Sequence, residues 1–596
     1  MRRPQNHRSR KAPRRRLGRK PRRGVIVVLT GFCLVALFAF VALSVDTGRM
    51  VLTETRMQNA VDAAALAAAQ EISSAVHDAA QGEGSASMDA NSIAVAEARA
   101  MAVDVAAANG VYIDPNVDVR FGKRTHNDVS GEWPIQWNTS PYNVVQVTAR
   151  RTESNVMEPD GQLPLAFGWA VGRSKVPLRS SATAFVEARD LVVVLDFSGS
   201  MNYDSNLVDS ELSQSDVEES LDLMWDAMVE ANPAWPGTST PKFLASGFGG
   251  INSYYGTKIN STDTNAIREA LNLEDNQSGS RKFPYPQAGR NSSGLPKSKP
   301  SNSTSDTLWG RYIDFVKNHP NSTYNKRYGY RTLMNFLQQK STSGFTPRDR
   351  YNSEDMWRTP HQPMNAVKNG ASLFLEFLDE LDFGDEVGLV GYGEWAEQVK
   401  DMNDGVVSID ISDNPITTDY EVIDVLQRHH QAGEFNGQTN MGDGILKARE
   451  LLSGVDGDPN DEGHSRYGAR PTMLIMTDGL ANKYPTGWTL PGGFLWSDWT
   501  DYDGDGSSDY STSDKNKQYA FYQAVKSIER GATLHTLGVG NEADTNLLQA
   551  IAFAGGGISI NVPGGTSVSE MESSLEEAFR EIASKVPPAK LIYVPE

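Results

Sequence analysis

Cysteine is nearly absent from this chain, because Cys33 is the only one among 596 residues. A single thiol excludes disulfides within the chain, so the folded parts must be held by apolar cores or by bound metals. Acidic residues are absent from residues 1–23, which contain twelve Lys or Arg. The rest of the chain carries 75 acids against 44 bases, a net charge of −31. The basic arm and the acidic body therefore face different surroundings.

The short motifs of common enzyme classes are also missing. The sequence contains no His-Glu-x-x-His, no Gly-x-Ser-x-Gly and no P-loop. His429 and His430 are adjacent on a predicted helix, where neighbouring side chains point about 100° apart, so we interpret them as surface residues rather than joint ligands. We expect a protein that is not an enzyme.

Long apolar runs are rare, and the one at residues 24–45 has 22 residues without a charge. A helix of that length crosses a bilayer core of roughly 30 Å. Because this run follows them directly, we interpret residues 1–23 as a basic arm beside a membrane and not as a nucleic-acid tail. The positive-inside rule places this arm in the cytoplasm and the acidic body outside the cytoplasm. A cleaved signal peptide is the alternative, but the run exceeds a usual signal core and no A-x-A-like site follows.

Three short elements surround this span: Arg22-Arg23-Gly24 before it, Asp46-x-Gly48-Arg49 after it, and the Ala-rich segment 58–69. Together they resemble the N-terminal region of the TadE/TadG-like proteins of Tad (Flp) pilus assembly. The resemblance covers about the first 75 residues. It implies a role in pilus assembly or another complex of the bacterial envelope.

Residues 46–188 are expected to form a helical stalk and a small membrane-proximal α+β module. A helix continues from the span to about residue 72, and a second Ala-rich helix is predicted near 89–108. Short segments of alternating polarity follow, as in half-exposed strands. No chemistry is visible in this region.

Residues 189–590 predict an α/β domain with a doubly wound, mostly parallel sheet. Strands without internal polar residues are typical of a sheet covered on both faces, and the apolar face of a helix near 364–381 supports such a cover. The predicted strands are 191–195, 386–392, 472–476, 533–539 and 558–562.

Oxygen-bearing side chains follow these strands at the ends where ligands gather in open α/β sheets. Asp196, Ser198 and Ser200 come after the first strand, Asp478 follows the strand at 472–476, and Thr439 precedes a predicted helix. On its own, Asp-x-Ser-Gly-Ser is also typical of a turn that closes a strand. Together the five residues resemble the metal-ion-dependent adhesion site of von Willebrand factor A domains, whose pattern is D-x-S-x-S with a distant Thr and a distant Asp.

The resemblance implies that these residues bind Mg²⁺ or Mn²⁺. Mg²⁺ prefers near-octahedral oxygen coordination. Two carboxylates and three hydroxyls leave one position for exchange, and only two negative charges face the cation. The resemblance implies that a protein partner offers a carboxylate to this metal. The alternative is a structural or regulatory subunit of an envelope complex, in which the metal mainly stabilises the fold.

Two insertions interrupt the domain, at about 202–362 and 480–514. The first is interpreted as a cap that shapes partner recognition, although Trp225 and Phe315 are expected to belong to its own small core. The second contains Asp501, Asp503, Asp505 and Asp509 at positions 1, 3, 5 and 9 of an EF-hand-like loop, with Gly506 at the turn. This loop predicts Ca²⁺ binding, and the alternative is a solvated acidic loop.

Overall fold

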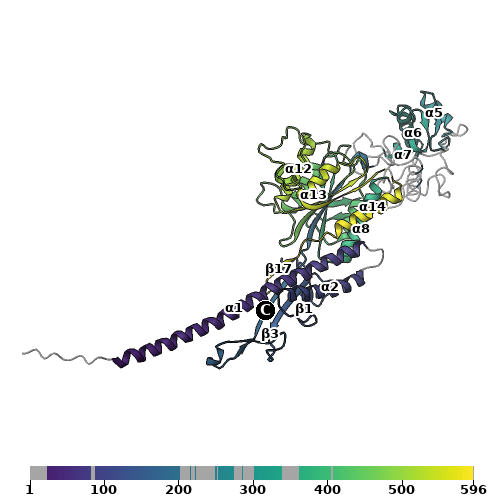
Figure 1. Cartoon of the computed structure of the whole chain (residues 1–596). Helices are drawn as coiled ribbons and strands as arrows, with labels where there is room; N and C mark the ends of the chain where they lie inside the picture. Colours follow the sequence, from purple (N-terminus) through teal and green to yellow (C-terminus); the bar gives the residue numbers. More distant parts are fainter. Residues whose placement is uncertain are drawn as a thin grey trace, which may run out of the picture. The chain divides into compact units, whose positions relative to one another are not determined.

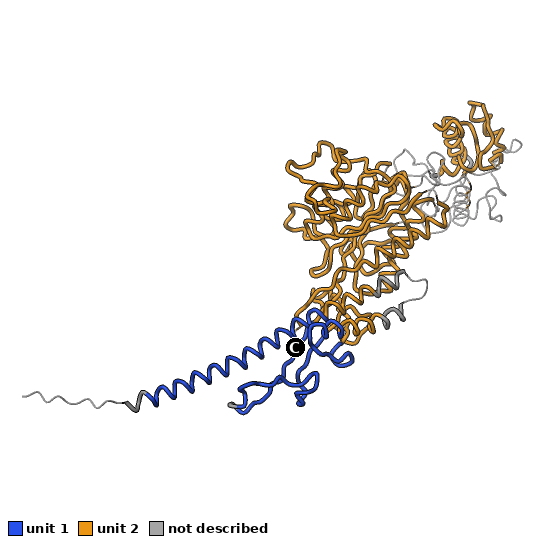
Figure 2. Tube along the Cα trace, viewed as in Figure 1, with its two compact units in different colours: residues 1–64, 103–119, 147–182 blue, residues 65–102, 120–146, 183–596 orange. Residues whose placement is uncertain are grey.

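The computed structural model describes residues 23–81, 87–201, 249–273, 301–338 and 361–594, together with residues 215, 222 and 285; within these ranges 252, 404–406, 436 and 565 are left out. The chain divides into two compact units (Figure 2). Unit 1 contains residues 1–64, 103–119 and 147–182, and unit 2 contains residues 65–102, 120–146 and 183–596.

The first helix, α1 (Arg23–Gln81), continues without a break from the apolar run into the Ala-rich segment. No proline interrupts it, as expected for so long a helix. Its large apolar side chains between Val27 and Val45 are 41–72% exposed. Further along, alanines four positions apart, such as Ala60, Ala64 and Ala68, are fully buried and form one packed stripe. The second Ala-rich helix is α2 (Ser87–Ala108), so both helix predictions are confirmed.

The membrane-proximal strands form a five-stranded sheet in the order β17-β6-β3-β1-β2. The predicted alternating segments supply three of its strands, and the pairs β1–β2 and β17–β6 are antiparallel. Between β3 and β6 the chain forms a small hairpin, β4–β5, with the 3₁₀ turn η1 at Gly168–Val171. The strands are β1 (Val119–Arg124), β2 (Ile135–Trp137), β3 (Val144–Arg151), β4 (Leu163–Pro164), β5 (Lys175–Val176), β6 (Leu178–Phe185) and β17 (Lys590–Ile592).

The larger sheet has six strands in the order β11-β10-β7-β14-β15-β16. All neighbours pair in parallel except β11, which is antiparallel to β10. The strand order reverses between β7 and β14, which is the switch point where open α/β sheets bind ligands. Its strands are β7 (Arg189–Asp196), β10 (Glu386–Tyr392), β11 (Ala396–Gln398), β14 (Arg470–Thr477), β15 (Thr533–Val539) and β16 (Gly556–Val562).

Helices cover both faces of this sheet, as Figure 1 shows. On β7, Leu191, Val193 and Leu195 pack on one side, and Val192 and Val194 pack on the other. The doubly wound architecture is therefore confirmed. The first layer contains α8 (Met364–Leu381), α9 (Tyr420–Arg428) and α14 (Val568–Ala583), and the second contains α10 (Met441–Ser453), α12 (Lys515–Ile528) and α13 (Thr545–Ala554).

The described part of the first insertion has its own aromatic core. Trp309, Tyr312 and Tyr285 are buried in it, and Phe315 packs against Phe336 at its edge. Phe315 thus lies where the sequence predicted, whereas Trp225 is outside the described residues. The elements here are β8 (Thr257–Lys258), α5 (Thr264–Ala270), α6 (Asn302–Lys317), β9 (Arg327–Tyr328) and α7 (Tyr330–Gln338); elsewhere the chain forms β12 (Asp401–Asn403), β13 (Ser408–Asp410) and α11 (Ser497–Thr500).

Candidate metal centre

Four of the five predicted adhesion-site residues lie at or just after the carboxyl ends of the two central strands. Asp196 ends β7, with Ser198 and Ser200 in the loop that follows, and Asp478 comes directly after the neighbouring strand β14. Thr439 lies at the start of α10, one residue before its N-cap. Two parallel strands that end together bring Ser200 and Asp478, which are 278 residues apart in sequence, to one edge, as expected for this type of sheet.

Hydrogen bonds connect four of the five residues. The Ser198 backbone N–H donates to Asp196 Oδ1 at 2.8 Å, and the Ser198 and Ser200 hydroxyl oxygens are 3.0 Å apart. The Ser200 hydroxyl donates to Asp478 Oδ1 at 2.7 Å. The two carboxylates are therefore joined through the Ser198 backbone N–H and the hydroxyls of Ser198 and Ser200.

Thr439 brings its hydroxyl to the same place. A Cβ atom added to Gly479 would lie 3.7 Å from Ser200 Oγ and 3.9 Å from Thr439 Oγ1. Both hydroxyl oxygens thus face the position that the missing side chain of Gly479 leaves open. The structure brings all five predicted residues to one cluster of oxygen atoms.

Sequence reasoning missed three residues that hold this cluster in position. The Thr477 hydroxyl donates to Asp196 Oδ2 at 2.7 Å, and Asn482 accepts the Thr439 N–H through its side-chain oxygen at 2.7 Å. Tyr392, at the end of β10, donates its hydroxyl to the Met476 carbonyl at 2.7 Å. A polar residue at the last position of a buried strand, as at Thr477, is the one signal that would have indicated such a role.

Asp196 is fully buried, and burial raises the pKa of its carboxyl because the charged form loses its hydration. Hydrogen bonds from Thr477 and Ser198 oppose that rise. A buried carboxylate is costly unless a cation or several hydrogen bonds compensate it. The donor set of two carboxylates and three hydroxyls matches the oxygen ligands that Mg²⁺ prefers, so the residues present fit the metal that the resemblance implied.

Phe197, the residue after Asp196, is supported by residues 430–435, which include a histidine that we predicted to lie on the surface. His430 packs against the rings of Phe197 and Phe435, its Nδ1 lies 3.1 Å from Glu434 Oε2, and its side chain is only 13% exposed. Gly433 donates its N–H to the carbonyl of Phe197 at 2.8 Å. The helix ends at Arg428, before both histidines. The prediction that His430 is a surface residue was also wrong, because a local pattern does not reveal a packing partner more than 200 positions away.

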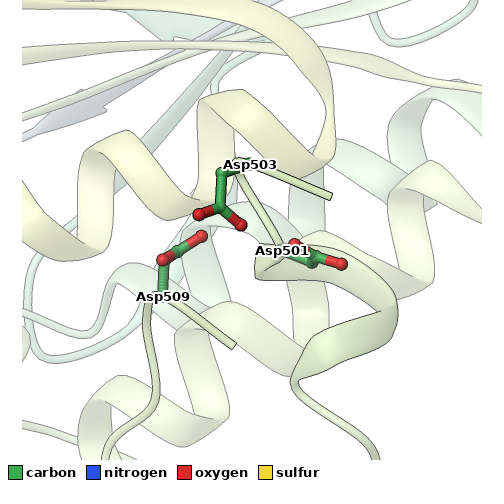
Figure 3. Close-up of side chains that lie close together, drawn as sticks. All are labelled: Asp501, Asp503 and Asp509. Atoms are coloured by element: carbon green, nitrogen blue, oxygen red, sulfur yellow. The ribbon is translucent and has the colours of Figure 1, made fainter. Parts of the chain in front are cut away.

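The acidic loop brings three of its four predicted aspartates together. Carboxylate oxygens of Asp501, Asp503 and Asp509 lie within 4.8 Å of one another (Figure 3). Asp501 accepts the backbone N–H groups of residues 504–506 at 2.8–3.0 Å, and Gly506 has the positive φ of 86° that the turn requires. Asp505 is not in the group, because its Oδ1 instead accepts the N–H and hydroxyl of Ser507.

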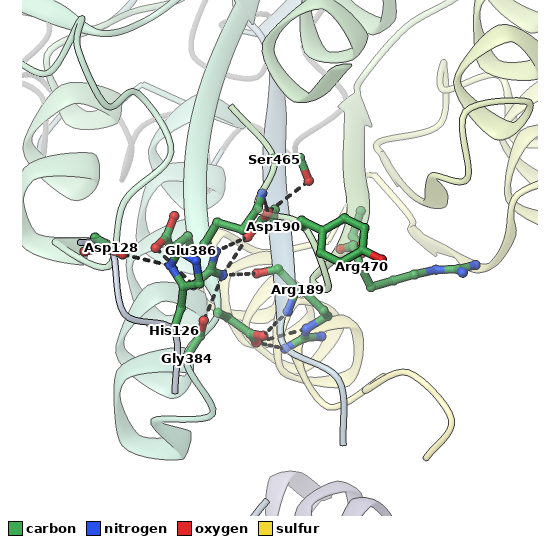
Figure 4. A network of polar contacts seen from close by, with 12 residues as sticks. His126, Asp128, Arg189, Asp190, Gly384, Glu386, Ser465 and Arg470 are labelled. Atoms are coloured by element: carbon green, nitrogen blue, oxygen red, sulfur yellow. Dashed lines mark hydrogen bonds and ion pairs between the residues drawn. The ribbon is translucent and has the colours of Figure 1, made fainter. Parts of the chain in front are cut away.

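At the opposite end of the sheet, acids are paired with arginines (Figure 4). Arg466 lies 2.6 Å from Asp190 and 3.0 Å from Glu386, which are paired with each other near the beginnings of β7 and β10. The buried Arg189 donates to both Asp385 carboxylate oxygens and to the carbonyl of residue 583. Burial raises the pKa of Glu386 to about 7, although Arg466 opposes the rise.

The chain was compared with family models, with curated sequences and with solved structures. Residues 24–71 match the family model of putative Flp pilus-assembly TadE/G-like proteins. No curated protein sequence matches the chain. The sheet order described above is that of the von Willebrand factor A-type fold, and the N-terminal region is TadE/G-like.

Three solved structures show the level of similarity. A von Willebrand factor type A protein from Catenulispora acidiphila is 18% identical over 37% of this chain and 38% of its own, with a TM-score of 0.23. BatB from Bacteroides thetaiotaomicron is 17% identical over 37% of this chain and 89% of its own, with a TM-score of 0.22. The pilus adhesin SpaC from Lactobacillus rhamnosus GG is 16% identical over 38% of this chain and 28% of its own, with a TM-score of 0.22. The chain thus spans less than two fifths of the first and third of these proteins.

Proposed function

We propose that this chain is a single-pass membrane protein that presents a metal-dependent, protein-binding A domain outside the cytoplasm. The observation that carries the proposal is the convergence of Asp196, Ser198, Ser200, Thr439 and Asp478 at the switch point of the sheet. The match of residues 24–71 to Flp pilus-assembly proteins supports a role in pilus assembly or surface attachment. The role is one of binding, not of catalysis.

The orientation follows from the distribution of charge. Residues 1–23 hold twelve basic residues and no acid, and α1 is the described helix that is long and apolar enough to cross a membrane. The arm then lies in the cytoplasm and the A domain in the periplasm or on the bacterial cell surface. A reporter that is active only outside the cytoplasm should function when fused after residue 190. Activity of a cytoplasmic reporter at that position would reverse the assignment.

The metal site would hold Mg²⁺ or Mn²⁺ through the carboxylates of Asp196 and Asp478 and the three hydroxyls. A bound divalent cation supplies an electrophilic position at which a partner's carboxylate binds. The protein prepares the site before any partner arrives, because Thr477 orients one Asp196 oxygen and Ser200 orients one Asp478 oxygen.

Capture of envelope proteins by the detergent-solubilised full chain tests this function. We expect capture in Mg²⁺ and its loss in a chelator while the circular dichroism of the chain stays unchanged. Asp196→Ala should abolish capture, whereas Asp413→Ala, which removes an exposed carboxylate elsewhere in the domain, should not. If a chelator unfolds the domain, or capture is the same in Asp196→Ala, the metal has the structural or regulatory role that is the alternative.

We also propose that the acidic loop binds Ca²⁺. The three clustered carboxylates of Asp501, Asp503 and Asp509 support this proposal, since Ca²⁺ takes carboxylate oxygens in flexible loops of this type. Ca²⁺ should then protect residues 480–514 from proteolysis. Equal cleavage with and without Ca²⁺ would return the segment to a solvated acidic loop.

A further inference from the structure

Within unit 1, a buried aspartate fixes a loop beside the end of the membrane span. Asp46 is the first charged residue after the apolar run, and it is only 7% exposed. Its two carboxylate oxygens accept the backbone N–H groups of Ala166 at 2.7 Å and Phe167 at 2.9 Å. These contacts tie the hairpin loop 165–174 to the helical turn at which the apolar run ends.

The loop lies at the membrane end of its module. Gln58 makes a second contact between α1 and the same module, donating to the Ser181 carbonyl at 3.2 Å. The twelve residues between Asp46 and Gln58 correspond to about 18 Å of helix. Side chains on a helix also lean toward its N-terminus, so the Asp46 carboxylate points back toward the apolar run. The loop is therefore the part of the module closest to the bilayer.

Two aromatic side chains of this loop are exposed. Trp169 is 71% exposed and Phe167 is 42% exposed. The backbone around them is compact, because a Cβ on Gly168 would lie 2.2 Å from the Arg173 carbonyl oxygen and 2.5 Å from a Leu165 methyl group. The turn ends at Gly172, which has a φ of 77°. The fold thus holds the aromatic rings outward on a fixed backbone.

We propose that loop 165–174 is a membrane-surface anchor whose Trp169 and Phe167 lie in the headgroup region of the bilayer that α1 crosses. Aromatic rings, Trp above all, prefer that interface, where an apolar body meets a wet, polar layer. Arg49 and Arg173 are exposed at the same level and suit lipid phosphates. Asp46 sets the depth of the loop. This inference rests on the membrane anchoring proposed above and extends it to the module.

Depth-dependent quenching of a single fluorophore tests the anchor. The full chain carries Cys33→Ala, and Ser174→Cys places an NBD label on an exposed position of the loop. The protein is reconstituted into phosphatidylcholine vesicles with lipids that carry a spin label near the headgroup. Leu43→Cys serves as the reference inside the span, and Arg56→Cys as the reference about 15 Å further along α1 than Asp46.

We expect the Ser174 label to be quenched several-fold more than the Arg56 label. Quenching equal to that of the Arg56 label, with the Leu43 label quenched, would overturn the anchor and leave a protein as the occupant of this surface. No quenching at Leu43 would instead overturn the membrane span itself. The two failures are therefore distinguishable.

Substitutions separate the roles of the loop residues. Trp169→Ser should reduce quenching of the Ser174 label, whereas Tyr467→Ser, which removes a 95% exposed aromatic elsewhere, should not. Asp46→Ala should lower quenching to the level of the Arg56 label, and Glu54→Ala, an exposed change on the same helix, should leave it unchanged. Unchanged quenching in both Trp169→Ser and Asp46→Ala would overturn the proposal.

Discussion

The buried acids at the two ends of strand β7 have different kinds of partner. At the amino end, Asp190 is paired with Arg466 at 2.6 Å and accepts further hydrogen bonds from Ser465 and the Arg466 N–H. At the carboxyl end, Asp196 accepts hydrogen bonds from the neutral groups of Thr477 and Ser198. The same strand therefore carries one carboxylate that a fixed cation neutralises and one whose described hydrogen-bond partners are neutral.

This difference fits the roles proposed for the two ends. The guanidinium groups of Arg189 and Arg466 belong to the fold, so the ion pairs at the amino end are permanent. Hydroxyls and backbone N–H groups orient Asp196 without cancelling its charge, as the proposed metal site requires. The predictions below test this contrast.

Arg189→Ala should produce the largest effect. It removes the two guanidinium N–H groups that donate to Oδ2 of the buried Asp385, and it removes the donor to the carbonyls of residues 583 and 585. We expect a loss of about 3–5 kcal/mol in the free energy of unfolding, measured by urea denaturation of the detergent-solubilised chain. Arg530→Ala, which removes a partly exposed ion pair with Asp456, should cost less than about 1 kcal/mol. Similar losses in both variants would contradict the assigned role.

Asp196→Ala should change the response to metal more than the fold itself. In the original chain, Mg²⁺ at a hundredfold excess over its Kd should stabilise the domain by about 2.7 kcal/mol. The variant should lose that gain, because one of the two anionic ligands is missing, and should unfold at the same urea concentration with and without Mg²⁺. Asp413→Ala is the control and should retain the gain. An undiminished Mg²⁺ effect in Asp196→Ala would be incompatible with the site.

Glu386 should make the amino end sensitive to pH. Its folded-state pKa of about 7 is above the ordinary value of 4.5, so the folded chain binds more protons than the unfolded chain between these values. The contribution of Glu386 to the free energy of unfolding is then fully present below pH 4.5. It falls by about 1–2 kcal/mol as the pH rises to 7.

The effect of Glu386 is isolated by subtracting the unfolding free energies of Glu386→Gln from those of the original chain at each pH. The subtraction matters because His535, whose pKa is lowered to about 4 by burial, acts in the opposite direction over part of this range. Glu421→Gln, an exposed change, should give a flat difference. A flat difference for Glu386→Gln as well would show that its carboxyl is not perturbed.

The smallest effect is expected in the acidic loop, where the structure separates two aspartates that the sequence grouped together. Asp503→Ala should abolish protection of residues 480–514 by Ca²⁺, since its carboxylate belongs to the cluster. Asp505→Ala should weaken protection only slightly, because that side chain is bonded to Ser507. The cleavage rates with and without Ca²⁺ measure both changes. Equal loss in the two variants would place Asp505 among the ligands.

The sequence was sufficient for the architecture of the larger domain and for the location of its candidate site. Strands at 386–392 and 533–539 and the helix at 364–381 have the predicted limits, because buried strands and a one-sided apolar helix carry strong periodic signals. The five oxygen-bearing residues of the candidate site could be grouped because parallel strands end at one edge. That rule needs only the order of strands and not their side-chain contacts.

Other features depend on contacts between distant residues and leave no periodic signal. Asn482, Gly433 and His430 act through hydrogen bonds or ring packing that no local pattern specifies. Asp505 has the right spacing, yet its own neighbour Ser507 competes for its carboxylate. The three residues of β17 are too few to show alternation, so their return to the membrane-proximal sheet was not predicted.

The return of β17 determines how tension would pass through the protein. The larger domain begins just after β6 and ends just before β17, and these strands pair directly, with Phe185 opposite Lys590. Lys590 also contacts Glu187 at 2.7 Å. A force on the larger domain therefore reaches the five-stranded sheet through two adjacent chain segments, which share the load. The larger domain is attached to the five-stranded sheet by two adjacent chain segments and not by a single linker.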